Sequence, residues 1–451
     1  MNLKNIHTVY FIGIGGIGMS ALARYFHVKG KHVIGYDKTP THLTEQLESE
    51  GIKVHFEDLG DIVLELAEIS STLVVYTPAI PKNMGELIAF QSRKYNILKR
   101  SEVLGYITRT SKGIGVAGTH GKTTTSTLLA HVLHQTVGCN AFLGGISTNY
   151  NSNLILDAHT EWTVMEADEF DRSFLQLHPF AGVLTNTDAD HLDIYQDSAH
   201  VIEGFHAYIN QINSDGFLLI HQSIQLSSLC RQITYSAKQK ADIYADNFQF
   251  VDEQFVFDVH VKGATWKNVA LGIPGIHNAE NALAVIGVCL EIGISEKEIR
   301  QSLASFLGVK RRFEYQIKRN DLVYIDDYAH HPTEIKALVQ SVRMLYPNKN
   351  IVGIFQPHLF SRTRDFMDEF AAELSQLDEV ILLPIYPARE LPMEGITSEA
   401  LAEKISNKSV SVKHPEDVIN YLKSRNQSEI ILTIGAGDID KIVEPLKQVL
   451  T

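Results

Sequence analysis

The chain has 451 residues, which at about 150 residues per domain suggests roughly three domains. Its 40 Lys and Arg against 53 Asp and Glu give a net charge of −13, the opposite of the balance typical of nucleic-acid binders. No apolar run reaches the roughly 18 residues of a membrane span, and Cys139, Cys230 and Cys289 show no disulfide pattern. We expect a cytoplasmic globular protein without nucleic-acid partners or membrane insertion. These features predict no oligomeric state.

Short apolar runs alternate with helical patterns along most of the chain, which predicts parallel strands in an α/β fold. Glycines interrupt the apolar N-terminal segment, so a signal peptide is not expected. Between residues 241 and 270 apolar and polar residues alternate, as in half-exposed antiparallel strands. Motifs restart near residues 105 and 313, which divides the chain into 1–105, 106–313 and 314–451. The predicted buried strands are 9–12, 33–36, 73–76, 113–117, 162–165, 182–185, 322–325, 351–355, 380–383 and 430–433.

The first strand is followed by a glycine loop of the form G-x-G-x-x-G. In such loops the backbone approaches a pyrophosphate, which the following helix N-terminus stabilises. Asp37 lies 19 residues after the last glycine, where a ribose-binding acid is expected. The pattern predicts a diphosphate nucleotide, with NAD as the default, unless the glycines serve only helix–strand packing. The loop glycines are Gly13, Gly15, Gly16 and Gly18.

A second glycine loop follows the strand 113–117 and has the form G-x-x-G-K-T. Val116 stands where the common G-x-x-x-x-G-K-T pattern requires glycine, which disfavours the general motor and GTPase families. The loop predicts backbone amides around phosphates, an ammonium on the β- and γ-phosphates and a threonine hydroxyl on Mg²⁺. The loop residues are Gly118, Thr119, His120, Gly121, Lys122, Thr123 and Thr124.

Two acidic segments, 166–169 and 185–193, follow predicted strands. Ligands of open α/β sheets bind at such strand ends, and Mg²⁺ needs few protein ligands because it keeps water and phosphate oxygens. Together with the phosphate loop, these segments predict a magnesium site; for either segment alone, a solvated acidic loop is the competing interpretation.

Three further polar segments remain ambiguous from the residues alone. Asn278 suits an adenine edge or a helix cap. The basic run 310–312 suits phosphate or a solvated face, and the ligand-type residues of 326–332 alternate in direction along a strand, which disfavours a zinc site.

In this order, the motifs resemble those of the Mur ligases, ATP-dependent amide-forming enzymes of peptidoglycan synthesis. The resemblance runs through essentially the whole chain and is greatest to the branch that adds L-alanine to UDP-N-acetylmuramate. Thr77 begins a stretch that departs from the family pattern and leaves its substrate contacts open. The motifs that carry the resemblance are Gly118–Thr123, Glu166, residues 186–191, 275–278 and 327–330, with residues 13–23, 355–358, 361–365 and 386–390 specific to the branch and 435–438 fitting it as well.

The resemblance implies an N-terminal Rossmann-like domain for the UDP sugar, a central ATPase with a mainly parallel sheet plus a small antiparallel sheet, and a C-terminal Rossmann-like domain. It also implies that the first glycine loop binds UDP rather than NAD, and that Thr77 contacts the UDP sugar. It implies that ATP phosphorylates the lactyl carboxylate and that the amine of L-alanine attacks the acyl phosphate. The implied residues are Lys122 and Arg312 on the phosphates, Asn278, Asp327 and Tyr328 on the nucleoside, Thr123, Glu166 and His191 on Mg²⁺, and His330, His358 and Arg362 toward alanine and the acyl phosphate.

Three alternatives remain: a recycling ligase that adds a preformed peptide to the same nucleotide, an NAD-dependent oxidoreductase, and a nucleotide-binding regulatory protein. The resemblance also has one notable gap. Relatives that add later amino acids carry a lysine, carbamoylated in use, shortly after the metal-binding histidine. This chain has no lysine between His191 and Lys238, and we place His206 at the corresponding position.

Overall fold

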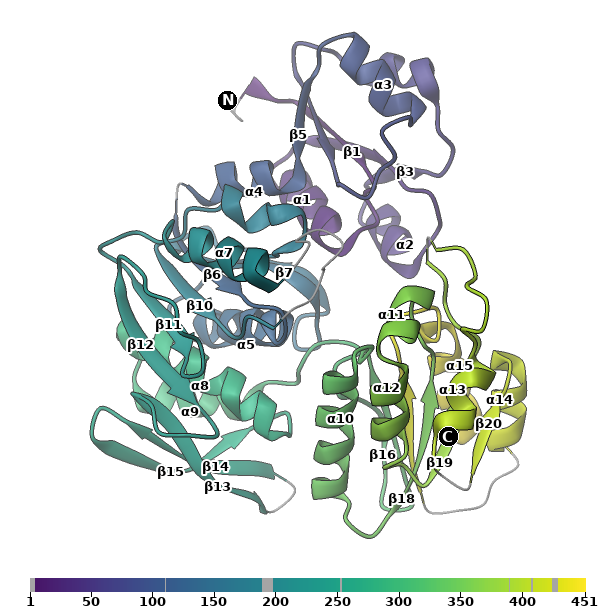
Figure 1. Cartoon of the computed structure of the whole chain (residues 1–451). Coiled ribbons are helices and arrows are strands. Elements are labelled where there is room, and N and C mark those ends of the chain that lie inside the picture. The colour runs from purple at the N-terminus through teal and green to yellow at the C-terminus, as the bar shows by residue number, and fades with distance from the viewer. Residues whose placement is uncertain are drawn as a thin grey trace. The chain divides into compact units, whose positions relative to one another are not determined.

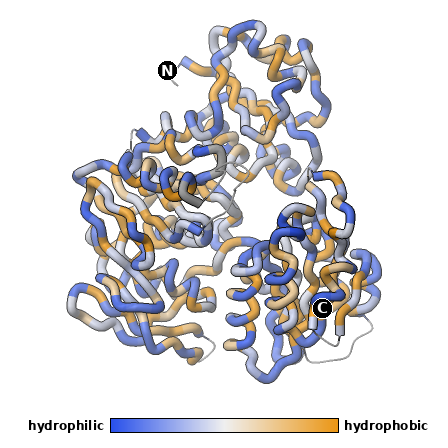
Figure 2. Tube along the Cα trace, in the orientation of Figure 1, coloured by the Kyte–Doolittle hydropathy of each residue, from blue (hydrophilic) through white to orange (hydrophobic). Residues whose placement is uncertain are grey.

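The structure is a computed structural model that describes residues 5–109, 111–188, 198–251, 254–388, 390–406, 409–423 and 429–451 (Figure 1). The chain forms two compact units. The first comprises residues 1–248, 256–272 and 279–307, and the second comprises 249–255, 273–278 and 308–451. The described residues build three sheets, and Figure 2 shows hydrophobic segments running along their strands.

The N-terminal sheet is wholly parallel, with the strand order β3-β2-β1-β4-β5. Helices cover both faces: Val9 and Phe11 share a core with α1 and α4, whereas Tyr10 and Ile12 share one with α3. The alternation of side chains along a strand produces this division. The elements are β1 (Thr8–Ile12), α1 (Ile17–Val28), β2 (His32–Tyr36), α2 (His42–Ser49), β3 (Lys53–His55), η2 (Gly60–Glu65), β4 (Thr72–Tyr76), α3 (Gly85–Ser92), β5 (Asn96–Lys99) and α4 (Arg100–Thr108).

The central sheet has ten strands in the order β15-β14-β13-β12-β11-β10-β6-β9-β7-β8. In this order, each neighbouring pair from β13 through to β7 is parallel, and β8 pairs antiparallel with β7. The elements are β6 (Lys112–Ala117), α5 (Lys122–Gln135), β7 (Asn140–Ser147), β8 (Ser152–Ile155), β9 (Trp162–Glu166), η3 (Phe170–Gln176), β10 (Ala181–Leu184), α7 (Ser198–Ile209), β11 (Phe217–His221), β12 (Arg231–Ser236), β13 (Ile243–Val251), β14 (Gln254–Val261), β15 (Ala264–Leu271), α8 (Ile276–Glu291) and α9 (Glu296–Ser305).

The C-terminal sheet has the order β16-β17-β21-β18-β19-β20, in which only the β16–β17 pairing is antiparallel among the described pairs. Ile351 and Phe355 share a core with α10 and α12, and Val352 and Ile354 share another with α14 and α15. The elements are β16 (Glu314–Lys318), β17 (Leu322–Asp327), α10 (Pro332–Leu345), β18 (Asn350–Phe355), α11 (Phe360–Asp365), α12 (Met367–Leu374), β19 (Glu379–Leu382), α13 (Ser398–Lys404), β20 (Val410–Val412), α14 (Pro415–Lys423), β21 (Glu429–Ile434) and α15 (Asp440–Leu450).

Helix α1 joins the N-terminal and central sheets within the first unit. Arg24 donates from Nη1 to Asn153 Oδ1 of β8 at 2.6 Å, and Asn153 Nδ2 donates to the carbonyl of Ile17 at 2.6 Å. The rings of Tyr25 and Phe142 of β7 lie 5.6 Å apart. Buried polar and aromatic contacts therefore fix the helix after the first glycine loop against the sheet that carries the second.

The predicted α/β fold and its mainly parallel sheets are confirmed. The predicted buried strands correspond to β1, β2, β4, β6, β9, β10, β17, β18, β19 and β21. The alternating stretch forms β13 to β15, which extend the central sheet at one edge. Only Lys262 and Gly263 connect β14 to β15, a link that antiparallel strands alone permit. Among the described residues, no helix combines the length and apolar character of a membrane span.

Candidate active site

The phosphate loop lies between β6 and α5, and two glycines with positive φ shape it. Gly118 has φ +131°, and a Cβ there would lie 2.0 Å from Thr185 Oγ1. Gly121 has φ +81° at the N-cap of α5, and a Cβ there would lie 2.8 Å from Asn281 Oδ1 of α8. Both positions exclude a side chain, so the backbone approaches its neighbours closely and leaves the loop amides at the helix N-terminus.

The segment after β10 braces this loop. Thr119 Oγ1 donates to the carbonyl of Asp188 at 2.7 Å, and Asn186 Oδ1 accepts from His120 N at 2.9 Å. Thr185 Oγ1 donates to the carbonyl of His120 at 2.6 Å. The second acidic segment therefore holds the loop's shape through its described residues; His191, the predicted metal ligand, lies outside the described residues.

Lys122 begins α5 and is already paired. Its Nζ donates to the carbonyls of Gly118 at 2.6 Å and Thr119 at 3.1 Å, and it lies 2.8 Å from Glu169 Oε2. Burial opposes its charged form, but the carboxylates of Glu169, Asp168 and Glu166 outweigh burial and raise the pKa of Lys122. The buried site therefore holds a fixed ammonium, the group that phosphate oxygens require.

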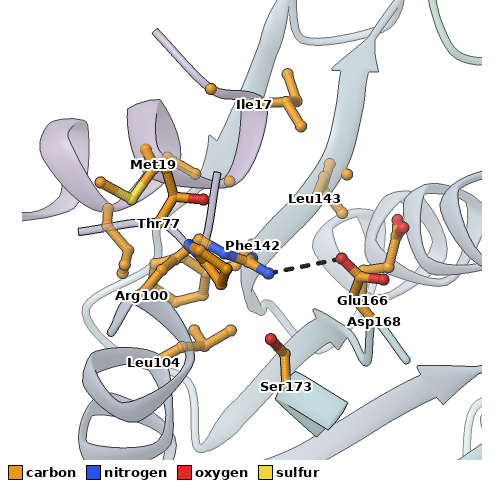
Figure 3. Close-up of a pocket in the computed structure, with 16 residues that line it drawn as sticks. Ile17, Met19, Thr77, Arg100, Leu104, Phe142, Leu143, Glu166, Asp168 and Ser173 are labelled. Atoms are coloured by element: carbon orange, nitrogen blue, oxygen red, sulfur yellow. Dashed lines mark ion pairs between the residues drawn. The ribbon is translucent and has the colours of Figure 1, made fainter. Parts of the chain in front are cut away.

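A cavity of about 230 Å³ lies in the first unit, between the first glycine loop and the ends of the central strands (Figure 3). Gly16, Gly18 and Thr77 line one side, and Glu166 and Asp168 line another. Mainly apolar residues, with Arg100 and Ser173, complete the wall. The remaining lining residues are Ile17, Met19, Ala21, Leu22, Pro78, Arg100, Leu104, Phe142, Leu143, Gly144 and Ser173.

The acidic side of the cavity is closely fitted. A Cβ on Gly144 of β7 would lie 2.1 Å from Glu166 Oε2, so that glycine makes room for the carboxylate at the end of β9. Asp168 Oδ2 lies 3.7 Å from Arg100 Nη2 across the cavity. An anionic and a cationic side chain thus face each other across the cavity.

The first glycine loop is held by Asp37. Gly15 N donates to Asp37 Oδ2 at 2.7 Å, and a Cβ on Gly15 would lie 2.8 Å from the same oxygen. Gly13 has φ +89° and lies against Thr77, whose Cγ2 would be 2.8 Å from an added Cβ. The structure thus gathers the predicted acid and Thr77 around the loop, and Gly16 and Gly18 reach the cavity.

In the second unit, the end of β17 and the segment before β16 are tied together. Asp327 accepts from Phe313 N at 2.7 Å and from Ala329 N at 2.8 Å. Burial, opposed by these backbone hydrogen bonds, raises the pKa of Asp327 to about 6. The guanidinium groups of Arg311 and Arg312 lie 5.2 Å and 5.8 Å from the Tyr328 ring centre.

Three other predicted residues gather in the same unit. The rings of His330 and His358 lie 6.1 Å apart, and Arg362 Nη1 lies 3.3 Å from His358 Nδ1. The His358 ring stacks on Tyr386 at 5.6 Å. Burial, His330 and Arg362 lower the pKa of His358 to about 4, and burial is the main cause that lowers the pKa of His330. Both imidazoles are therefore neutral near pH 7.

Asn278, predicted to meet adenine or to cap a helix, donates from Nδ2 to the carbonyl of Pro274 at 2.6 Å. That bond holds the turn into α8. Sequence reasoning gave Arg100 no role, and it covered Glu169, Asn186 and Arg311 only as members of the segments 166–169, 185–193 and 310–312. Glu169 lies inside the acidic segment 166–169, so its pattern could have pointed to it; Arg100 and Asn186 meet their partners only through the fold.

Three family models match the chain: Mur ligase family, catalytic domain, over residues 8–112; Mur ligase middle domain over 116–289; and Mur ligase, glutamate ligase domain, over 311–437. The UDP-N-acetylmuramate–L-alanine ligase of Flavobacterium psychrophilum is 49% identical over 451 residues, covering 100% of this chain and 99% of that protein. That of Porphyromonas gingivalis W83 is 48% identical, with 98% of each chain covered. Among solved structures, the UDP-N-acetylmuramate–alanine ligase of Thermotoga maritima has a TM-score of 0.85 at 26% identity, with 98% of both chains covered. A murein peptide ligase from Psychrobacter arcticus has a TM-score of 0.72 at 25% identity over 98% of both chains.

Proposed function

The chain belongs to the Mur ligase family, and we propose that it joins L-alanine to the lactyl carboxylate of UDP-N-acetylmuramate with cleavage of ATP, in peptidoglycan precursor synthesis. The observation that carries the proposal is the cavity of the first unit. Its wall combines Gly16 and Gly18 of the first glycine loop with Glu166 and Asp168. Asp168 directly precedes Glu169, the partner of Lys122. A UDP sugar bound at the first loop would therefore extend its lactyl carboxylate toward the phosphate loop.

The reaction has two displacements. A carboxylate oxygen of the lactyl group attacks the γ-phosphorus of ATP, ADP leaves, and an acyl phosphate forms. The amine nitrogen of L-alanine then attacks the acyl carbon, loses a proton, and inorganic phosphate leaves. Phosphoryl transfer depends mainly on positioning and charge stabilisation, and we assign these tasks to Lys122 and to the amides of residues 118–124.

The donor set also fits Mg²⁺. Hard oxygen donors are available in the Thr123 hydroxyl and the Glu166 carboxylate, which lies in the space left by Gly144. The described residues contain no cluster of three His, Cys, Asp or Glu side chains suited to a metal, in keeping with an ion that takes most ligands from phosphate and water. We propose Thr123, Glu166 and His191 as its protein ligands; when bound, it would neutralise charge on the ATP phosphates.

The second unit supplies the remaining proposed contacts. Arg312 would bind phosphate oxygens, Asp327 and Tyr328 the ribose region, and Asn278 the adenine. His330, His358 and Arg362 would face the amine and the acyl phosphate. Neutral imidazoles, as the lowered pKa values imply, can accept a hydrogen bond or a proton, which suits the side of the site where alanine loses its proton.

We further propose that the three segments 1–105, 106–313 and 314–451 act as UDP-sugar, ATP and amino-acid domains. The described thiols of Cys139, Cys230 and Cys289 are all unpaired and buried, which agrees with a reducing cytoplasm as the working compartment.

Release of phosphate from ATP tests the proposal. We expect release that requires both UDP-N-acetylmuramate and L-alanine, with the amide product detected by mass spectrometry. Release with a preformed peptide but not with L-alanine would instead identify the recycling ligase. Phosphate release that depends on neither UDP-N-acetylmuramate nor L-alanine would reject the ligase assignment.

A further inference from the structure

The charges that line the cavity of the first unit are unbalanced. Among its described lining residues, Glu166 and Asp168 are acidic and Arg100 is the one cation. The proposed substrate brings a diphosphate at one end and a carboxylate at the other. The diphosphate has the amides of the first glycine loop and the N-terminus of α1. The carboxylate must enter beside two acids, and Arg100 is the one side chain among the described lining residues that can compensate its charge; Mg²⁺ on Glu166 would add to that compensation when bound.

Arg100 is placed for that task. It is the first residue of α4, and its side chain is 22% exposed. Its Nη1 lies 2.6 Å from where a Cβ on Gly18 would be, so that glycine leaves room for the guanidinium over the first turn of α1. Figure 3 shows Arg100 extending across the cavity toward Asp168. The guanidinium therefore lies between the first glycine loop and the acidic side that leads to Lys122.

The pair with Asp168 is loose. Nη2 and Oδ2 are 3.7 Å apart, which is longer than the 2.7–2.9 Å of a charge-assisted hydrogen bond, and the Asp168 side chain is 37% exposed. A partly exposed ion pair of this length contributes little to the stability of the fold. It does show that a carboxylate can occupy the position in front of the guanidinium.

We propose that Arg100 binds the lactyl carboxylate of UDP-N-acetylmuramate, which displaces Asp168 from the guanidinium. This inference rests on the proposed function. Arg100 then distinguishes UDP-N-acetylmuramate from UDP-N-acetylglucosamine, which has the same nucleotide, diphosphate and sugar but lacks the lactyl ether. It also holds the attacking carboxylate at the edge of the acidic wall, with the planar donor geometry that suits carboxylates.

The test measures binding of both nucleotides by calorimetry, with a non-hydrolysable ATP analogue present. Arg100→Met should weaken UDP-N-acetylmuramate about 10- to 100-fold, the range expected for a lost hydrogen bond to a charged group, and UDP-N-acetylglucosamine by less than about threefold. Arg100→Lys keeps the charge without the fork and should show an intermediate, still selective loss. Asp168→Asn removes the competing carboxylate and should leave UDP-N-acetylmuramate affinity equal or higher.

A loss of affinity in Arg100→Met together with unchanged or higher affinity in Asp168→Asn separates a binding role from a structural one. Equal losses for both nucleotides would place Arg100 on the diphosphate and overturn the proposal, as would no loss. Parallel losses in Arg100→Met and Asp168→Asn would mark the pair as structural and also overturn it. Thermal denaturation checks folding, and Arg100→Lys with Asp168→Asn decides the matter if Arg100→Met does not fold. A wild-type protein that neither prefers UDP-N-acetylmuramate nor releases phosphate would reject the proposed function itself.

Discussion

The two glycine loops of the first unit have the same strand–loop–helix arrangement but hold opposite charges. In the first loop, Gly15 N donates to the carboxylate of Asp37. In the second, the carbonyls of Gly118 and Thr119 accept from the ammonium of Lys122. The second loop therefore contains its own cation for phosphate. In the first loop, by contrast, the amide of Gly15 is hydrogen-bonded to an acid.

The two loops also differ in how far along the chain their nearest cation lies. Lys122 is four and three residues from the two carbonyls it contacts, so the phosphate loop is almost complete within one short segment. Beside the first loop the cation is Arg100, about 80 residues later in the chain, which begins α4 directly after β5 and lies near Gly18 because α4 packs against α1. The nucleotide-sugar half is thus the part more exposed to changes in packing.

The largest effect should come from Lys122→Ala. Loss of the only ammonium in the phosphate loop should lower the ligation rate about a thousandfold or more, because charge stabilisation dominates phosphoryl transfer. UDP-N-acetylmuramate binding should change little, since Lys122 does not line the cavity. Phosphate release and calorimetry measure the two effects, and a comparable loss of UDP-sugar affinity would contradict the separation of the two loops.

The control for that variant addresses folding. Removing Lys122 takes away the ammonium that faces the buried Glu169, which is only 2% exposed, and removing one partner of a buried ion pair is strongly destabilising. Adding Glu169→Gln should restore the melting temperature of Lys122→Ala but not its activity. Recovered activity in the double variant would show that the single variant was inactive through misfolding.

Gly15→Val tests the first loop. Its branched side chain would meet Asp37 Oδ2 and Thr44 Cγ2, each already 2.8 Å from a Cβ at this position, and would fill the space above the loop amides. UDP should raise the melting temperature of the wild type but not of this variant, and the ligation KM for the UDP sugar should rise about tenfold or more. Protection of the wild type by NAD rather than UDP would contradict the assignment of the loop.

Contiguous motifs made much of this arrangement predictable. The phosphate loop places Lys122 by local geometry, and the strands that precede both loops follow from short apolar runs. Eight of the described strands were not predicted: β3, β5, β7, β8, β11, β12, β16 and β20. Several of them are short and half-exposed and lack a clear apolar run, but β11 is a buried apolar run that the sequence did offer. The roles of Arg100 and Asn186 were not predicted for another reason: their partners are 68 and 66 residues away in sequence, and only tertiary packing brings them together.

The cluster of predicted residues in the second unit also depends on tertiary structure. His330, His358 and Arg362 come from two separate segments, and the sequence offered them only through resemblance. The structure brings them within a few ångströms by placing the ends of β17 and β18 at the same edge of a parallel sheet. Topology, rather than spacing, gathers this cluster.

A smaller effect should appear in the acid stability of that cluster. His358 has an ordinary pKa of 6.5 when unfolded and about 4 when folded, so between these values the unfolded chain binds more protons and stability falls as the pH falls. His358→Gln removes this contribution. Between pH 7.5 and 5.0 the variant's melting temperature should drop less than that of the wild type, by roughly 2–4 °C. An equal drop would show that His358 is not a source of acid sensitivity; Arg364→Gln, an exposed charge outside the cluster, serves as the control.

The smallest effect, none at all, is expected from bicarbonate. Mur ligases that add later amino acids use a carbamoylated lysine shortly after the metal-binding histidine, whereas residues 192–237 here contain no lysine. The corresponding His206 lies on the exposed face of α7, with Nε2 3.4 Å from Asn210 Nδ2, and an imidazole cannot form that carbamate. Any second Mg²⁺ would then depend on phosphate, substrate and water oxygens, which this ion accepts readily. Ligation in degassed buffer should therefore proceed at the same rate before and after bicarbonate is restored. A rate that falls on degassing and recovers with bicarbonate would show that a carbamate forms at another lysine, and would contradict the role given to the missing one.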